Sequence, residues 1–174
     1  MGARSLSVAV GRLGVVERLV EIQETVRTAA RQVVLADGAT FVLRDGDECF
    51  YADEDAMSPL WKGQRFPLTR CISGWAMLND EVAIVPDITQ DERIPLEAYR
   101  PTFVKSLVMV PVGRGGPAAA IGAYWARVHA ATLREVEMLE ELADATAAAI
   151  TRIGLDDAPF TPASLRSRES ATRP

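Results

Sequence analysis

The chain has 174 residues, of which 48% are hydrophobic and 25% charged, which is the composition of one globular domain with a substantial core. Its net charge of -5 and pI near 5.0 argue against a broad nucleic-acid-binding surface. Two cysteines cannot build the disulfide framework of a small secreted protein, and no apolar run approaches the ~20 residues that cross a bilayer. We therefore expect a cytoplasmic protein that binds neither nucleic acid nor membrane.

The first long element expected is an amphipathic helix over residues 13–35, where apolar residues recur every three or four positions opposite a charged face. The helix is expected to end at Asp37-Gly38, because glycine favours a helix C-terminus. Two strands follow, over 39–43 and 48–52. The turn signal Arg44-Asp45-Gly46-Asp47 between them predicts a hairpin.

The middle of the chain, residues 61–112, places short apolar runs between Pro, Gly, Asn and Asp breaks. The pattern predicts a short helix over 74–78 with Ser73 as its N-cap, a strand over 82–85 and a turn of helix over 96–100. This middle segment is rich in aromatic residues and lies between regular elements. That layout is typical of a domain that binds a small molecule.

The most apolar strands are expected over 106–112 and 118–125, joined by a glycine-rich loop. A long helix follows over 132–153, and Thr132-Leu133-Arg134-Glu135 has the spacing of a capping box at its start. The remaining residues are rich in Pro, Ser, Thr and Arg, a composition that indicates a flexible tail. The expected organisation is an N-terminal extension, one domain and this tail: 1–12, 13–153 and 154–174.

Five motifs, in this order, resemble the GAF domain family of small-molecule sensing modules, in particular the GAF domains ahead of bacterial histidine kinases. They are Phe66-Pro67-Leu68, Cys71 to Ala76, Val82 to Ile88, Arg93-Ile94-Pro95 and Ser106 to Val112. The resemblance covers roughly residues 15–153. It implies an α/β (α+β) fold: a GAF-like central antiparallel sheet with long N- and C-terminal helices on one face.

The resemblance also implies a ligand site between the sheet and the middle segment. Aromatic walls with a few polar groups suit a flat small molecule. An equally open alternative is that the same aromatic side chains only fill the core. The candidate ligand-binding residues are Phe66, Cys71, Ser73, Trp75, Tyr99, Phe103, Met109 and Tyr124.

The sequence does not identify a cofactor. GAF domains that attach a bilin through a cysteine typically place a histidine directly after it, but Ile72 follows Cys71, and His129 is the only histidine. Zinc would need more Cys and His ligands. Some GAF proteins reduce free methionine sulfoxide with clustered thiols, and Cys49 with Cys71 would have to perform that chemistry here. Alternation along the chain does not tell whether the two thiols meet. We therefore expect a protein without enzymatic activity, with a free methionine sulfoxide reductase that uses Cys49 and Cys71 as the alternative.

The expected function is regulatory: a signalling domain that binds a small molecule or a protein partner and relays its state through the terminal helices. A homodimer is expected, and a histidine kinase or another signalling protein would read the output. A further alternative is a dimerisation module without ligand. The apolar face of the last helix would supply the dimer interface in either case, through Leu133, Leu139, Leu142 and Ile153.

Overall fold

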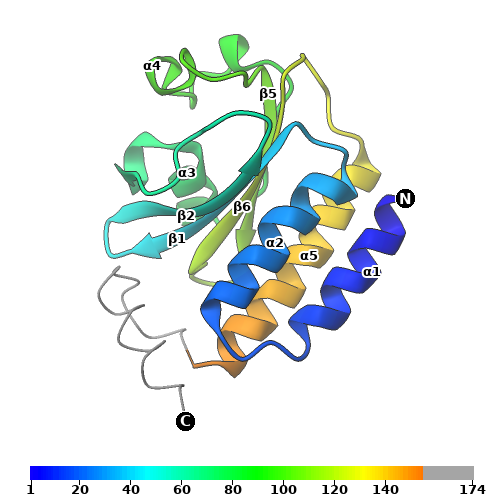
Figure 1. The fold of residues 1–174 in the computed structure, drawn as a ribbon. Coiled ribbons are helices and arrows are strands. Elements are labelled where there is room, and N and C mark those ends of the chain that lie inside the picture. Colours follow the sequence, from blue (N-terminus) through cyan, green and yellow to red (C-terminus); the bar gives the residue numbers. More distant parts are fainter. Residues whose placement is uncertain (155–174) are drawn as a thin grey trace.

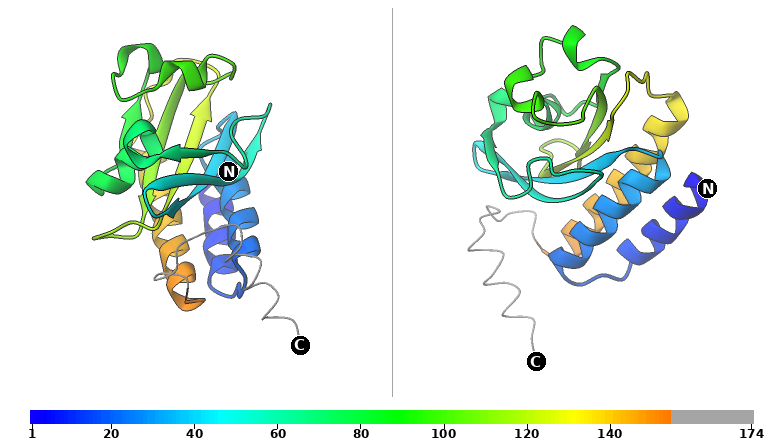
Figure 2. Two further views of the ribbon diagram at one scale, coloured as in Figure 1. Left: turned by 90° about the vertical axis from the view of Figure 1, so that its left-hand side faces the viewer. Right: turned by 45° about the horizontal axis from the view of Figure 1, so that its top comes forward.

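A six-stranded antiparallel sheet lies between a layer of long helices and a layer of short helices and loops (Figures 1 and 2). The structure, a computed structural model, describes residues 1–154. The strand order is β3-β2-β1-β6-β5-β4. This arrangement confirms the predicted fold class. The strands are β1 (Gly38–Asp45), β2 (Glu48–Ala56), β3 (Arg65–Pro67), β4 (Ala83–Val85), β5 (Ser106–Val112) and β6 (Ala119–Trp125).

Three helices form the first layer: α1 (Gly2–Leu13), α2 (Leu19–Val33) and α5 (Leu133–Arg152). The capping box predicted for the last helix is confirmed. The Thr132 hydroxyl accepts a hydrogen bond from the Glu135 amide at 3.2 Å, and the Glu135 carboxylate accepts from the Thr132 amide at 2.7 Å. Apolar faces of all three helices join β1, β5 and β6 in one core cluster.

The N-terminal part differs from the prediction. Residues expected to be an extension form helix α1, and the helix expected over 13–35 begins only at Leu19. The break between the two helices runs over residues 14–18. Helix α1 is itself amphipathic and buries Leu6, Ala9 and Leu13 against α2 and α5. The Arg152 guanidinium donates to the carbonyl oxygens of Leu13 and Val16 at 2.7 and 2.8 Å and so holds the end of α1.

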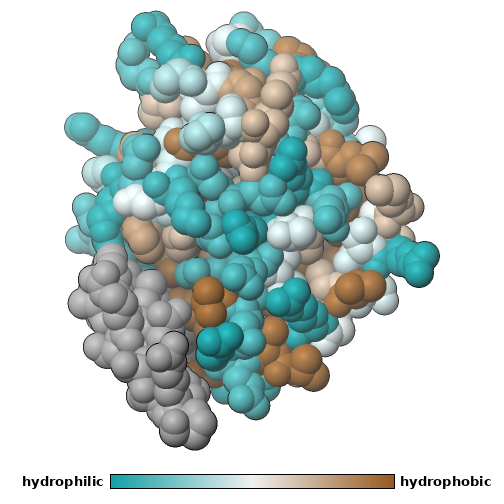
Figure 3. Space-filling model, viewed as in Figure 1, coloured by the Kyte–Doolittle hydropathy of each residue, from teal (hydrophilic) through white to brown (hydrophobic). Residues whose placement is uncertain are grey.

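The predicted dimer interface is not a free surface. Leu139 and Leu142 are 0% exposed because α5 packs on β5, β6 and α2, and α1 covers its outer side. Ile153 is half-buried in the same core, and only Leu133 is well exposed. On the face shown in Figure 3, apolar residues stand in small groups among hydrophilic ones. A dimer built on the buried leucines would require α5 to leave its own core.

The second layer comprises α3 (Ile72–Asn79), α4 (Leu96–Tyr99) and the 3₁₀ turns Leu68–Arg70 and Ile88–Gln90. Together with the loops between them, these elements enclose a second core cluster on the other face of the sheet. The short helices and β4 lie close to the predicted ranges. The predicted tail lies outside the described residues except for Gly154, and no helix within residues 1–154 is long and apolar enough to span a membrane.

Candidate functional site

A β-bulge in β2 decides which side chains face the second core cluster. Tyr51 pairs with Val42 and Asp53 pairs with Phe41, so Ala52 is the extra residue in the strand. Before the bulge, Cys49 and Tyr51 point into the second cluster. After it, Asp53 contacts helix α2. Strict alternation would have placed Asp53 beside Tyr51, so the bulge changes which residues reach the site.

The bulged strand brings Cys49 to Cys71, which precedes α3 and is its N-cap. The two sulfur atoms lie 3.2 Å apart and neither forms a disulfide. The Ser73 hydroxyl donates to the Cys71 sulfur at 3.3 Å, and the Gly74 amide donates at 3.4 Å. The predicted N-cap, Ser73, therefore lies inside the helix, where its hydroxyl also shares a hydrogen bond with that of Tyr51 at 3.0 Å.

This geometry separates the acidities of the two thiols. The hydrogen bond from Cys49 lowers the pKa of Cys71 to about 7, helped by Ser73 and the Gly74 amide and opposed by burial. The same hydrogen bond and burial raise the pKa of Cys49 well above its usual range. Cys71 is therefore the thiolate of the pair near neutral pH, and Cys49 keeps its proton.

Five aromatic side chains pack together in the second cluster with the thiols. Trp61 meets Tyr51, Tyr99 and Tyr124 edge to face, with ring centroids 5.6, 4.8 and 5.6 Å apart. Phe66 packs against Tyr51 in the same manner. Burial raises the pKa of all three tyrosines, so their hydroxyls stay neutral. The buried Tyr124 hydroxyl shares a hydrogen bond with that of Thr40 at 2.8 Å.

A pocket of about 230 Å³ opens beside this aromatic cluster. Its lining includes the aromatic residues Trp61 and Phe66 and the polar residues Gln64 and Thr102. The orientation of the Trp61 indole is fixed because its Nε1 donates to the Ala98 carbonyl oxygen at 3.1 Å. The pocket therefore offers a ring-sized apolar surface whose position is set by α4 and the Trp61 segment.

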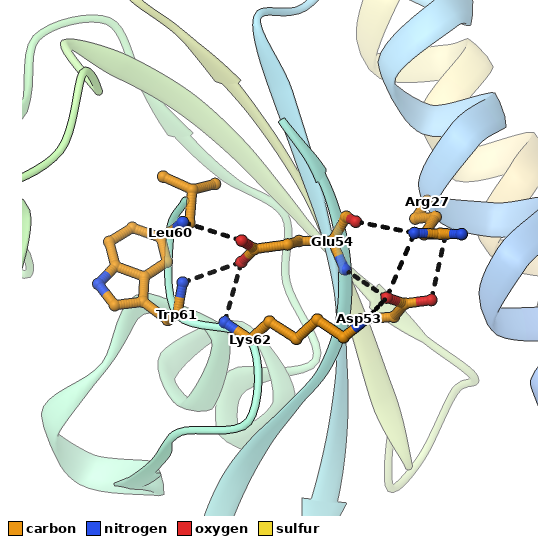
Figure 4. Close-up of polar contacts among 6 residues, drawn as sticks. All are labelled: Arg27, Asp53, Glu54, Leu60, Trp61 and Lys62. Atoms are coloured by element: carbon orange, nitrogen blue, oxygen red, sulfur yellow. Dashed lines mark hydrogen bonds and ion pairs between the residues drawn. The ribbon is translucent and has the colours of Figure 1, made fainter. Parts of the chain in front are cut away.

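A chain of polar contacts links the Trp61 segment to helix α2 (Figure 4). The Glu54 carboxylate accepts hydrogen bonds from the backbone amides of Leu60, Trp61 and Lys62, all at 2.9 Å. The neighbouring Asp53 is buried and pairs with the Lys62 ammonium at 2.7 Å, and with the guanidinium of Arg27, on α2, at 3.1 Å. Successive residues of β2 thus hold the pocket wall on one side and α2 on the other.

The structure brings all eight candidate ligand-binding residues to the second cluster: Cys71, Tyr99, Met109 and Tyr124 within it, Ser73 hydrogen-bonded to Tyr51, and Phe66, Trp75 and Phe103 packed against it. Trp75 is half-buried beneath the Arg93 guanidinium, 4.4 Å from the ring centroid, and Phe103 packs over Gly38 at the start of β1. Sequence reasoning missed Tyr51, Trp61 and Glu54 as site residues, although Trp61 stood within the aromatic-rich middle.

Other polar clusters do not resemble a cofactor site. His129 pairs with Glu135 at 3.1 Å and packs on the Trp125 ring, in the helix layer. A hollow of about 350 Å³ beside α5 is lined by Arg114 and four acids, Asp80, Glu81, Glu140 and Asp144. Over the described residues, no three His, Cys, Asp or Glu side chains gather closely enough to hold a metal ion.

Residues 17–151 match the family model of the GAF domain. The chain belongs to the GAF domain family. Helix α1 lies outside the matched range. A sequence search of characterised proteins finds no significant match.

Solved structures show how widely this GAF fold is used. The GAF domain of an Acinetobacter phosphoenolpyruvate-protein phosphotransferase has a TM-score of 0.74 and 13% identity, covering 87% of this chain and 94% of that one. Free methionine-R-sulfoxide reductase from Neisseria meningitidis, solved with its substrate, has a TM-score of 0.75 and 17% identity, covering 87% and 89%. The chromophore-binding domain of a bacteriophytochrome from R. palustris has a TM-score of 0.72 and 16% identity, covering 86% and 61%. At these identities the likeness establishes the fold alone.

Proposed function

We propose that the chain is a regulatory GAF domain that binds a flat, largely apolar small molecule beside Trp61 and passes its bound state to helix α2. The observation that carries this proposal is the contact chain through Glu54 and Asp53. One wall of the pocket and one helix of the opposite layer are held by adjacent residues of the same strand.

The contact chain makes ligand binding and helix position interdependent. A ligand that moves the Trp61 ring also moves the backbone amides that donate hydrogen bonds to Glu54. It thereby also moves the Lys62 ammonium that pairs with Asp53. Since Asp53 is buried, a change at Lys62 alters its pairing with Arg27 more than it would at an exposed site. A ligand with different affinities for the two arrangements would shift their populations, and a signalling partner such as a histidine kinase could read the position of the terminal helices.

The size and lining of the pocket define the probe. About 230 Å³ accommodates a small ring system, and a lining that includes Trp61 and Phe66 favours an aromatic one. The R. palustris structure, a chromophore-binding domain on the same fold, supports the choice of a planar ligand class. Indole and quinoline are suitable first probes because each carries one nitrogen that can meet Gln64 or Thr102.

The test measures binding and its effect on α2 separately. Indole binding is titrated by calorimetry, and amide hydrogen exchange of residues 19–33 is compared with and without indole. We expect slower exchange in α2 of the wild type and a loss of this response in Asp53→Asn, with affinity changed by less than about threefold. Asp55→Asn is the matched control, because Asp55 pairs with Arg31 on α2 at 2.6 Å without contacting Lys62. Binding without any effect on α2, or no binding of either probe, would refute the proposal.

A second candidate function is reduction of free methionine sulfoxide, because the two thiols do meet. The Neisseria reductase shares the fold. However, an amino-acid substrate brings an ammonium group that favours a carboxylate partner, no acid lines the pocket, and both oxygens of the nearby Glu54 already accept hydrogen bonds from backbone amides. Formation of methionine from its free R-sulfoxide with dithiothreitol, abolished by Cys71→Ser, would establish the reductase; no turnover would exclude it.

A further inference from the structure

The two thiols are arranged for chemistry that the proposed ligand pocket does not use. Cys49 is 0% exposed on β2, whereas Cys71 is 7% exposed at the start of α3. They are the only cysteines of the sequence, lie 22 positions apart and yet are in sulfur-sulfur contact. Cys71 is therefore the less deeply buried residue of the pair, and Cys49 lies next to it in the core.

Three groups that can stabilise a thiolate lie close to the sulfur of Cys71, which as a thiol donates to Cys49 and to the Pro67 carbonyl oxygen at 3.5 Å. The Cys49 thiol, the Ser73 hydroxyl and the Gly74 amide lie 3.2, 3.3 and 3.4 Å from the Cys71 sulfur. The amide belongs to the first turn of an eight-residue helix, whose N-terminus also favours negative charge. This environment suits a nucleophilic thiolate at Cys71, and it places Cys49 as the thiol that would react second.

We propose that Cys49 and Cys71 form an oxidation site for small hydroperoxides, with Cys71 as the attacking thiolate and Cys49 as the resolving thiol. The Cys71 sulfur attacks the outer oxygen of ROOH, the O–O bond breaks, and ROH leaves after taking a proton, so Cys71 becomes a sulfenic acid. The Cys49 sulfur then attacks the Cys71 sulfur, its proton leaves with the hydroxyl as water, and a disulfide forms. In total, two thiols lose two electrons and ROOH becomes ROH and water.

The geometry allows this disulfide with a small displacement. The sulfur atoms must approach from 3.2 Å to the ~2.05 Å of a disulfide, a movement of roughly 1.2 Å. The new bond would tie β2 to the start of α3 and remove the thiolate that Ser73 and Gly74 address. Ser73 also contacts Tyr51, which packs on Trp61, so oxidation would reach the wall of the proposed pocket.

A hydroperoxide fits the site better than a charged oxidant. Most side chains that face the thiols are apolar or carry neutral hydroxyls, including Tyr51, Ser73 and Phe66, while Arg44 pairs with Cys49 across the sheet. A small neutral molecule enters such surroundings at a lower desolvation cost than a charged one. A free amino-acid sulfoxide would bring an ammonium and a carboxylate into the same space.

The test uses the full reduced chain and hydrogen peroxide, followed by intact mass and peptide mapping. We expect a loss of two hydrogens and a Cys49–Cys71 cross-linked peptide, with peroxide consumption at least about 100-fold faster than in the urea-unfolded chain. Cys49→Ser should accumulate a sulfenic acid at Cys71 that dimedone traps. Cys71→Ser should lower peroxide consumption to the unfolded level and leave Cys49 unlabelled.

Several outcomes would overturn the proposal: labelling of Cys49 in Cys71→Ser, equal reactivity of folded and unfolded chains, or oxidation by free methionine-R-sulfoxide faster than by peroxide. Circular dichroism identifies a variant that fails to fold, and Cys71→Ala then provides a second variant without the thiol. Indole binding by reduced Cys71→Ser separates the two proposals, because the ligand pocket is expected to work without the thiol. If Cys71→Ser loses its reactivity with peroxide but still binds indole, the result supports the oxidation site and leaves the proposed regulatory function unaffected.

Discussion

The lowered pKa of Cys71 predicts how its reactivity depends on pH. Thiolate is the reactive form, so the rate of bimane modification should rise with pH and reach half its maximum near the pKa of about 7. Ser73→Ala removes one donor to the thiolate. A hydrogen bond of about 1 kcal/mol corresponds to about 0.7 pKa unit, so the midpoint should move upward by that amount. Ser106→Ala, whose hydroxyl donates to the Arg127 carbonyl oxygen instead, should leave the midpoint unchanged.

Glu54 is the residue on which the pocket wall depends. Its carboxylate accepts three backbone amides, and a glutamine would keep one acceptor oxygen while pointing its own NH₂ group at amide donors. Glu54→Gln should therefore lower the free energy of unfolding by about 2 kcal/mol and weaken indole binding. Glu97→Gln, in an exposed ion pair with Arg100, should change it by less than about 0.5 kcal/mol. Urea titration followed by fluorescence measures both, and equal effects would contradict the role of the carboxylate.

At the scale of helices, two glycines make a matched pair. A Cβ at Gly74 in α3 would lie only 1.9 Å from the backbone oxygen of Leu68, so Gly74→Ala must displace α3 from the preceding turn. We expect a loss of at least about 2 kcal/mol in stability and a lower reactivity of Cys71. Gly11 in α1 has no atom within 4 Å of such a Cβ, and Gly11→Ala should stabilise the chain by about 0.5–1 kcal/mol. Thermal unfolding measures both variants, and the unfolding temperature should fall in Gly74→Ala and rise in Gly11→Ala.

The helices and strands also show which parts of the fold could be predicted from the sequence. Periodicity and capping signals are local, so α5 with its Thr132 cap and the apolar strands β5 and β6 were predicted well. The bulge at Ala52 left no such signal, yet it separates Asp53 from Tyr51 and sends them to opposite faces. Contacts between distant residues, such as Cys49 with Cys71, depend on tertiary packing that local patterns do not encode. The candidate site was therefore predicted as a region, whereas its chemistry required the three-dimensional structure.

For the whole molecule, the position of α1 gives the decisive test of self-association. Leu6, Ala9 and Leu13 cover α2 and α5, and α5 is the helix from which the dimer interface was expected. Removing residues 1–16 would expose that apolar surface to solvent, and a second copy is the most available partner for it. Light scattering should then show tighter self-association than in the full chain, together with a lower unfolding temperature.

Arg152→Ala provides the milder companion to this truncation. The variant loses two hydrogen bonds to the end of α1 while keeping the apolar contacts, so it should loosen α1 without abolishing its packing. We expect faster amide exchange in residues 2–13 and self-association between that of the full and the truncated chain. If the truncated chain stayed folded and monomeric, the surface beneath α1 would be no dimer interface. Any dimer of the full chain would then have to use another face of the molecule.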